Sequence, residues 1–247
     1  MKRGVVVLLL LFCAADTARA QSIQSAVDAA MSTPPFDAAL WFVLVEDEEG
    51  RVVFGENSTK LAIPASVRKL FSSATIATCL DVESQLETQL WLDGEDVVLR
   101  GGGDPSFGSD RHGYEPETSA FAPFVLALRG RGIVRVRDVI GDVSMFDRVT
   151  LPYQWKLGNV PYDTAAPVDA LTFSENDLGS SAVPSPGHFA ALALRDALEA
   201  GGITVTGTIR TVAEPRTWAE HVATVRSPLV YDLLATVLKP SHNLFAE

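Results

Sequence analysis

Residues 63–70, with the sequence IPASVRKL, constrain the fold most because a proline and a serine lead directly into a helix-like pattern at residues 70–80. Pro64 restricts the residue before it to extended geometry and is common where helices begin. Ser66 is therefore expected in the first helical turn, near free backbone N–H groups and the positive end of the helix dipole. Lys69 follows three residues later, so both side chains are expected to project from the same helix face.

A serine one turn from a lysine has two interpretations. It is a candidate nucleophile and base, provided that burial lowers the pKa of the lysine enough to leave part of it neutral. The alternative is a serine helix cap followed by a surface lysine. S-x-x-K is a short motif, and other parts of the sequence are needed to decide between the two.

The composition favours a globular protein and argues against several functions. The 247 residues, 47% hydrophobic and 21% charged, are enough for one large domain or two small ones. The formal net charge is −11, and no basic patch with interleaved aromatic residues occurs, so nucleic acid is not an expected partner. The four histidines show no spacing of metal ligands, so we expect structural or surface histidines and no metal: His112, His188, His221 and His242.

The first twenty residues have the plan of a secretory signal peptide. Two basic residues precede an apolar run at residues 5–15, and the small-x-small sequence Ala18-Arg19-Ala20 follows. The run is too short to span a bilayer as a helix. The sequence therefore predicts cleavage near Gln21 and export across the inner membrane to the periplasm or another extracytoplasmic location.

The two cysteines support no internal disulfide. Cys13 lies in the apolar run and would be lost with the signal peptide; a lipid anchor at Cys13 is the alternative, which the bulky Phe12 before it does not favour. Cys79 is then the only cysteine of the mature chain. Its place in an apolar helix predicts a buried thiol that packs as a small hydrophobic group.

The order of the predicted elements indicates an α+β fold. A short helix at residues 22–31 precedes a hairpin at 38–54, and the helix that follows Ser66 comes next. Two strands at 87–92 and 96–99 are joined at Asp93-Gly94. Further elements are predicted downstream: helices at 118–130 and 187–201, a strand at 203–209, and a helix that begins at Ser227-Pro228 and ends before Pro240.

Two separated motifs give the chain a family resemblance. Ser66-Val67-Arg68-Lys69 and Ser241-His242-Asn243 resemble S-x-x-K and S-x-N, the first two motifs of penicillin-binding proteins and serine β-lactamases. Five stretches in order are more narrowly similar to the class C low-molecular-mass penicillin-binding proteins, the D-alanyl-D-alanine carboxypeptidase/endopeptidase family. These stretches are residues 64–70, 101–105, 141–147, 227–229 and 243–247.

The resemblance implies an α+β, penicillin-binding-protein/serine β-lactamase-like transpeptidase core with an inserted, mostly-β domain between the first two motifs. After the signal peptide at residues 1–20, the implied divisions are the first part of the core with the hairpin and nucleophile helix (21–85), the inserted domain (86–185), and the return to the core, ending at the S-x-N motif (186–247). The insertion is shorter than is usual in the family.

The resemblance also implies a reaction. Ser66 would attack the carbonyl of the penultimate D-alanine of a peptidoglycan stem peptide, with Lys69 as base, and water would hydrolyse the acyl-enzyme. Ser241 would relay a proton to the leaving amine, and Asn243 would hold the substrate amide. β-Lactam antibiotics would acylate the same serine, and no metal or organic cofactor is required.

The third family motif, K-[TS]-G, has no counterpart in the sequence. We therefore expect a truncated gene product or partial sequence, incomplete at the C-terminus. Three alternatives to the carboxypeptidase are a non-catalytic pseudoenzyme that binds cell-wall peptide, an inactive truncated product, and a serine β-lactamase, against which the long insertion argues. An α/β-hydrolase esterase is not expected because no G-x-S-x-G elbow occurs.

Overall fold

The computed structural model describes residues 23–153, 155–160, 162–179, 181–214 and 219–247. The predicted signal peptide and Cys13 lie outside these residues. Within them, no helix combines the length and the apolar character that crossing a bilayer would require. The chain divides into two compact units, Met1–Ala65 and Ser66–Glu247. Each is described by itself.

The first unit contains a helix at residues 23–31, the 3-10 turn η1 (Phe36–Ala38), and an antiparallel hairpin of β1 (Val43–Glu46) and β2 (Val52–Glu56). The strand predicted to begin at residue 38 begins later, at Val43. Val43 pairs with Glu56, the last residue of β2, and Asn57 then turns the chain away with a φ of +50°, so the described residues before Val43 have no strand partner. The Asn57 side-chain amide donates to the Trp41 carbonyl (2.9 Å) in place of a backbone pair.

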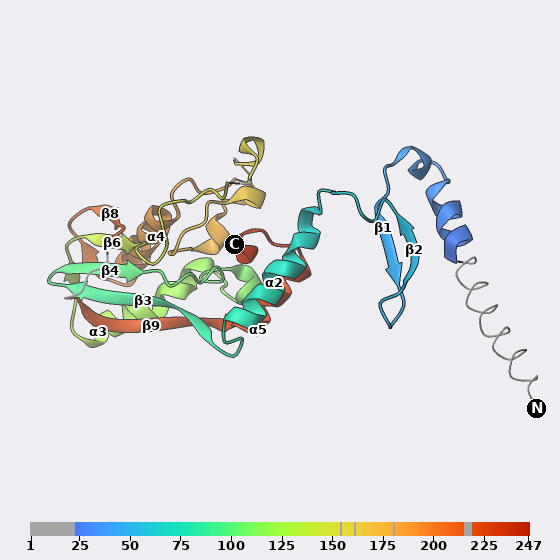
Figure 1. Ribbon diagram of the computed structural model, residues 1–247. Coiled ribbons are helices and arrows are strands. Elements are labelled where there is room, and N and C mark those ends of the chain that lie inside the picture. The colour runs from blue at the N-terminus through green and yellow to red at the C-terminus, as the bar shows by residue number, and fades with distance from the viewer. Residues whose placement is uncertain (1–22, 154, 161, 180, 215–218) are drawn as a thin grey trace, which may run out of the picture. The chain divides into compact units, whose positions relative to one another are not determined.

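The second unit contains most of the regular structure (Figure 1). Its strands are β3 (Gln85–Asp93), β4 (Asp96–Arg100), β5 (Arg135–Val136), β6 (Val139–Asp142), β7 (Thr204–Val205), β8 (Ile209–Val212) and β9 (Glu220–Leu229). Its helices are α2 (Arg68–Cys79), α3 (Ala122–Gly130), α4 (Pro186–Ala200) and α5 (Val230–Leu238). Short 3-10 turns connect them: η2 (Ala65–Val67, at the unit boundary), η3 (Asp110–His112), η4 (Glu117–Phe121), η5 (Leu157–Asn159), η6 (Asp163–Ala165), η7 (Ser174–Asn176) and η8 (Leu244–Ala246).

A five-stranded mixed sheet organises this unit, with strand order β8-β6-β4-β3-β9. β3 pairs antiparallel with β4 and with β9, and the predicted turn at Asp93-Gly94 joins β3 to β4, with Gly94 at a φ of +64°. β4, β6 and β8 are parallel, and helices α3 and α4 provide the crossovers between them. The sheet therefore takes strands from both sides of residue 185, and the predicted domain boundaries at 85 and 185 stay predictions.

One apolar cluster joins the sheet to both crossover helices. Alternate strand residues such as Leu90, Val97 and Leu99 pack with Phe124 of α3 and Leu194 of α4, all fully buried. An aromatic group extends this core beyond the strands. It consists of Phe107 with Phe121, Phe124, Phe173 and Tyr114, at ring-centroid distances of 5.2–6.2 Å from Phe107.

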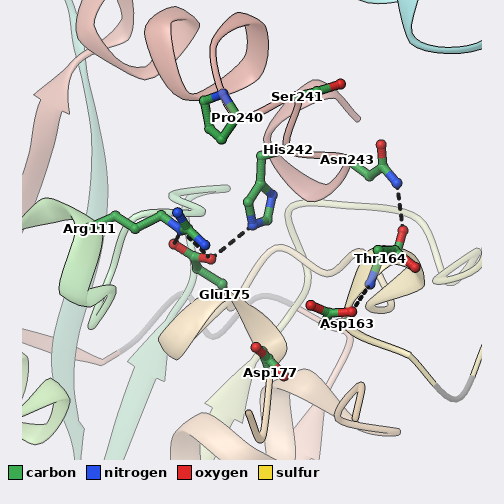
Figure 2. A pocket seen from close by; sticks show the side chains of 9 residues that line it. All are labelled: Arg111, Asp163, Thr164, Glu175, Asp177, Pro240, Ser241, His242 and Asn243. Atoms are coloured by element: carbon green, nitrogen blue, oxygen red, sulfur yellow. Dashed lines mark hydrogen bonds and ion pairs between the residues drawn. The ribbon is translucent and has the colours of Figure 1, made fainter. Parts of the chain in front are cut away.

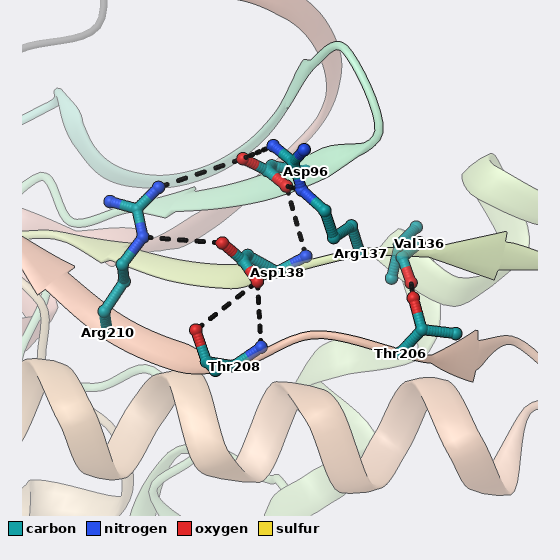
Figure 3. A network of polar contacts seen from close by, with 7 residues as sticks. All are labelled: Asp96, Val136, Arg137, Asp138, Thr206, Thr208 and Arg210. Atoms are coloured by element: carbon teal, nitrogen blue, oxygen red, sulfur yellow. Dashed lines mark hydrogen bonds and ion pairs between the residues drawn. The ribbon is translucent and has the colours of Figure 1, made fainter.

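A charged network lies where the three parallel strands begin (Figure 3). The buried Asp96 carboxylate accepts two hydrogen bonds from Arg137 (2.8 and 2.9 Å), and these bonds lower the pKa of Asp96. Asp138 accepts from the Thr208 backbone N–H (2.8 Å), and Arg210 lies within 4 Å of both carboxylates. The network therefore joins the first residue of β4 to residues close to the starts of β6 and β8.

Three local predictions are wrong. The strand predicted at residues 203–209 is two strands, β7 and β8, which belong to different sheets. Ser227 and Pro228 do not begin a helix but continue β9, because the Ser227 hydroxyl accepts from the Leu86 N–H (2.9 Å) and Leu229 still pairs with Gln85. Cys79 is exposed, since the buried residues of α2 are Lys69 and Ser73 rather than its apolar ones. Strand pairing with β3 overrides the helix-start signal at Ser227, and the polar inward face of α2 leaves Cys79 on the outer surface.

The aromatic core gives the first prediction. Replacing Phe107 by alanine removes a fully buried ring and its aromatic contacts, so the free energy of unfolding should fall by about 3–5 kcal/mol in urea denaturation. Leu126→Ala is the matched control because that α3 side chain is 69% exposed, and its effect should stay within about 0.5 kcal/mol. Equal losses for the two variants would contradict this assignment of the core.

Candidate active site

Helix α2 directs a lysine, not an apolar residue, into the protein. Lys69 is only 8% exposed and Ser73, one turn later, is 7% exposed, whereas the neighbouring Leu70 and Phe71 are 60% and 73% exposed. The buried face of α2 lies against α5 and η8. The helix thus brings the lysine of the S-x-x-K motif to the segment that follows α5.

Among the residues that the structure describes, the acceptors of the Lys69 ammonium group all belong to the S-x-N motif. Its Nζ donates to the backbone carbonyl of Ser241, to the Ser241 Oγ (3.1 Å) and to the Asn243 Oδ1 (2.5 Å). Three N–H groups and three acceptors match the inventory of a charged lysine. Burial lowers the pKa of Lys69, and the negative charge of Glu247 opposes this effect in part.

The S-x-N loop has an unusual backbone because it must turn between α5 and η8. Ser241 has a φ of +61°, a left-handed conformation that non-glycine residues rarely adopt. The His242 N–H returns to the Thr236 carbonyl on α5 (3.3 Å), and the Asn243 amide donates to the Thr164 carbonyl (2.6 Å). Contacts with two separate elements therefore hold the loop in this turn.

Ser66 lies in η2, three residues before Lys69, and its side chain is exposed. The residue before it, Ala65, has a φ of +45°, so the turn at the start of α2 is also left-handed at one position. The structure thus joins Lys69, Ser241 and Asn243 by hydrogen bonds and places Ser66 at the adjacent end of α2. The catalytic roles of these four residues stay predictions.

A buried carboxylate lies on the other side of the S-x-N loop and was not predicted. Glu175 accepts from the His242 Nε2 (2.8 Å), from the Ser109 hydroxyl (2.5 Å) and from the Arg111 Nε (3.2 Å). Burial alone would raise the pKa of Glu175, but the hydrogen bonds from His242 and Ser109 outweigh it and lower the pKa to about 2. Glu175 is therefore an ionised group that connects three separate segments.

The turn that carries Glu175 is conformationally costly. Ser174, Glu175 and Asn176 have φ values of +50°, +55° and +55°, which makes η7 a left-handed turn. The fully buried Asn176 holds the turn in place. Its side-chain amide donates to the Pro167 carbonyl (2.9 Å), and its backbone carbonyl accepts from the Val183 N–H (2.8 Å). The surrounding contacts fix the direction of the Glu175 side chain.

A cavity of about 180 Å³ separates the S-x-N loop from this turn (Figure 2). In Figure 2 His242 points toward Glu175, whereas Ser241 points away from it. The residues that line the cavity are mostly charged or polar: Arg111, Asp163, Thr164, Glu175, Asp177, Pro240, Ser241, His242 and Asn243. Burial, and next the charge of Asp163, raises the pKa of Asp177. Polar groups of both signs thus line a space beside Ser241.

Sequence reasoning missed Glu175 and Thr164 because both lie in residues 151–178, where no periodic pattern predicts a regular element. His242 was expected to be a structural or surface residue. One signal was available in the sequence, namely that the middle position of the S-x-N motif is an imidazole, a side chain that can donate a hydrogen bond to a carboxylate.

Comparisons with known proteins agree on one family. The model of the D-Ala-D-Ala carboxypeptidase 3 (S13) family matches residues 23–195 and 179–247. A D-alanyl-D-alanine carboxypeptidase of Actinomadura sp. strain R39 is 26% identical over 173 residues, which are 66% of this chain and 30% of that protein. A carboxypeptidase of Mycobacterium tuberculosis is 24% identical over 197 residues, 75% of this chain and 41% of that protein.

Solved structures confirm the fold. Penicillin-binding protein 4 of Haemophilus influenzae matches with a TM-score of 0.70 at 16% identity, over 80% of this chain and 58% of that one. The same protein in complex with a novel β-lactam matches with a TM-score of 0.56. The predicted α+β, penicillin-binding-protein-like fold is therefore confirmed. The chain spans less than half the length of the two curated relatives and 58% of this solved chain.

The buried carboxylate gives the second prediction. The pKa of Glu175 is lowered in the folded state, from 4.5 to about 2, so its stabilisation is present above pH 4.5 and is lost as the pH falls toward 2. Glu175→Gln should lower the free energy of unfolding at pH 7 by about 2–3 kcal/mol and flatten its fall between pH 4.5 and 2. Urea denaturation across this range measures both effects.

The exposed Glu83 provides the matched control for this experiment. Glu83→Gln should change the free energy of unfolding by less than about 0.5 kcal/mol at each pH. If the Glu175→Gln and wild-type curves run parallel from pH 7 to pH 2, Glu175 is not the stabilising ionised group described above.

Proposed function

The chain belongs to the D-Ala-D-Ala carboxypeptidase 3 (S13) family, and from this membership we propose that it is a serine-type D-alanyl-D-alanine carboxypeptidase/endopeptidase acting on peptidoglycan stem peptides. One observation carries the proposal. A buried lysine of the S-x-x-K motif is hydrogen-bonded to both the serine and the asparagine of the S-x-N motif. A surface lysine after a helix cap, the alternative interpretation of S-x-x-K, would have neither the burial nor these partners.

In the proposed reaction, the Ser66 Oγ forms a bond to the carbonyl carbon of the penultimate D-alanine. The C–N bond to the terminal residue breaks, and the departing amine takes up the proton that Ser66 gave up. Water then attacks the ester, the stem peptide leaves with a new carboxylate, and Ser66 regains its proton. β-Lactams would react by the same first step: the ring C–N bond opens, the ring nitrogen takes the proton, and the acyl group stays on Ser66.

Proton transfer depends on the state of Lys69. In its charged form all three N–H groups are used by Ser241 and Asn243. In the neutral form two N–H groups remain and one lone pair becomes available to accept a proton. Burial lowers the pKa of Lys69 and so favours this form, which fits a base for Ser66.

Ser241 and Asn243 would then act after the attack. The Ser241 Oγ lies 3.1 Å from the Lys69 Nζ, close enough to pass a proton from the lysine to the leaving amine. Asn243 would give up its hydrogen bond to Lys69 and bind the amide of the substrate in its place. The backbone N–H of Ser66 would donate to the oxyanion, a contact of the kind worth about 3–4 kcal/mol.

The predicted signal peptide supports action outside the inner membrane, in the periplasm or another extracytoplasmic location, where stem peptides occur. Proteins of similar sequence carry the names D-alanyl-D-alanine carboxypeptidase and carboxypeptidase, and a similar fold has been solved with a β-lactam. These names support the substrate class that we propose here.

The third prediction tests the nucleophile. Fluorescent penicillin should label the purified full chain covalently, and Ser66→Ala should abolish the label because no other group takes the acyl chain. Gel fluorescence and the increase in intact mass measure the adduct. Ser72→Ala, a serine on the same helix, should be labelled as fast as the wild type. A wild-type chain without label would favour the alternative, a non-catalytic peptide-binding pseudoenzyme.

The fourth prediction separates the base from a structural cation. Lys69→Arg keeps a positive charge but cannot lose its proton near neutral pH, whereas Lys69→Met loses both charge and base. Both variants should slow penicillin acylation by about 10²–10⁴-fold if Lys69 is the base. Labelling of Lys69→Arg at the wild-type rate would show that Lys69 contributes only its charge.

A further inference from the structure

His242 occupies the middle of the S-x-N motif, and its side chain leaves the loop on the side opposite to Ser241 (Figure 2). We propose that His242 is a positioning residue: its hydrogen bond to Glu175 holds Ser241 and Asn243 where Lys69 and the substrate need them. The inference rests on the proposed function, since it concerns the same acylation step.

The first support is the way His242 is held. Its side chain is 17% exposed, its ring packs edge-on against Phe245 (4.8 Å between centroids, 68°), and its Nε2 lies 2.8 Å from the Glu175 carboxylate. The Nδ1 atom is buried and has no hydrogen-bond partner among the residues that the structure describes. The orientation of the imidazole therefore depends on one polar contact, the contact with Glu175.

The second support is that residues outside the S-x-N loop hold Glu175 in place. Ser109 and Arg111 hold the carboxylate from another segment, and Asn176 holds the left-handed turn that carries it. His242 thus joins a loop with a strained residue, Ser241 at a φ of +61°, to the left-handed turn η7, which other segments hold in place. Losing this contact would let the turn at Ser241 relax.

The third support is the short path from His242 to the reacting groups. Its immediate neighbours in sequence, Ser241 and Asn243, provide the three acceptors that the described residues offer to the Lys69 ammonium. A displacement of about 1 Å at catalytic groups can cost about 10²-fold in rate. A relaxed loop would therefore slow acylation even though, in the part of the chain that the structure describes, no hydrogen bond joins His242 to Lys69.

The test compares three variants of the full chain. His242→Leu removes the donor to Glu175 and should lower the second-order rate of acylation by fluorescent penicillin by about 10–100-fold. His242→Gln retains an N–H donor at a similar reach and should restore most of this loss. His188→Leu removes an exposed imidazole on α4 and serves as the matched control, with an unchanged rate.

A double-mutant comparison separates positioning from a general folding defect. If His242 acts through Ser241 and Asn243, His242→Leu should cause no further loss in a Ser241→Ala/Asn243→Ala background. Hydrogen exchange gives a readout that needs no turnover: the amides of His242 and Ala246 should exchange faster in His242→Leu, while those of the buried strand β6 keep their protection.

The outcomes distinguish the inference from the proposed function. A wild-type chain that takes no label contradicts the proposed function, and the inference falls with it. A labelled wild type with an equally fast His242→Leu overturns the inference alone. A loss that persists in the Ser241→Ala/Asn243→Ala background, or that His242→Gln does not restore, also overturns it.

Discussion

The candidate site depends on a buried ammonium group whose acceptors lie 172 and 174 residues further along the chain. A buried charge without partners is expensive, so helix α2 and the S-x-N loop stabilise each other, and neither has its functional geometry alone. The five-stranded sheet makes their meeting possible, because β9 pairs with β3, the strand that follows α2 in the chain, and leads directly into α5 and the loop. The fold thus serves mainly to bring two short motifs into contact.

A second buried charge acts on the same three residues from the opposite side. Lys69 takes its acceptors from Ser241 and Asn243, whereas Glu175 takes a donor from His242. The side chains of Ser241 and Asn243 therefore face a cation, and the side chain of His242 between them faces an anion. This arrangement offsets the cost of the left-handed backbone at Ser241 with contacts that no single neighbour could supply.

Local patterns predicted the hairpins and most of the main helices, since each depends on short-range periodicity. The family resemblance grouped Lys69, Ser241 and Asn243 in one predicted site. Local patterns failed where tertiary contacts decide. The cap-and-proline signal at Ser227 was overridden by pairing with β3, and Cys79 is exposed because α2 buries polar residues. Glu175 could not be predicted, because its importance comes from a left-handed turn in a segment without periodicity and from partners 64 to 67 residues away.

The distance in sequence between Lys69 and its acceptors also constrains how the chain folds. Lys69 and Ser241 are 172 residues apart, so bringing them together costs the conformational entropy of closing a long loop. In the unfolded chain water solvates the Lys69 amine, and the amine is buried only when α5 and η8 pack against α2. The geometry of the candidate active centre therefore depends on contacts of long sequence separation, the kind that slows folding.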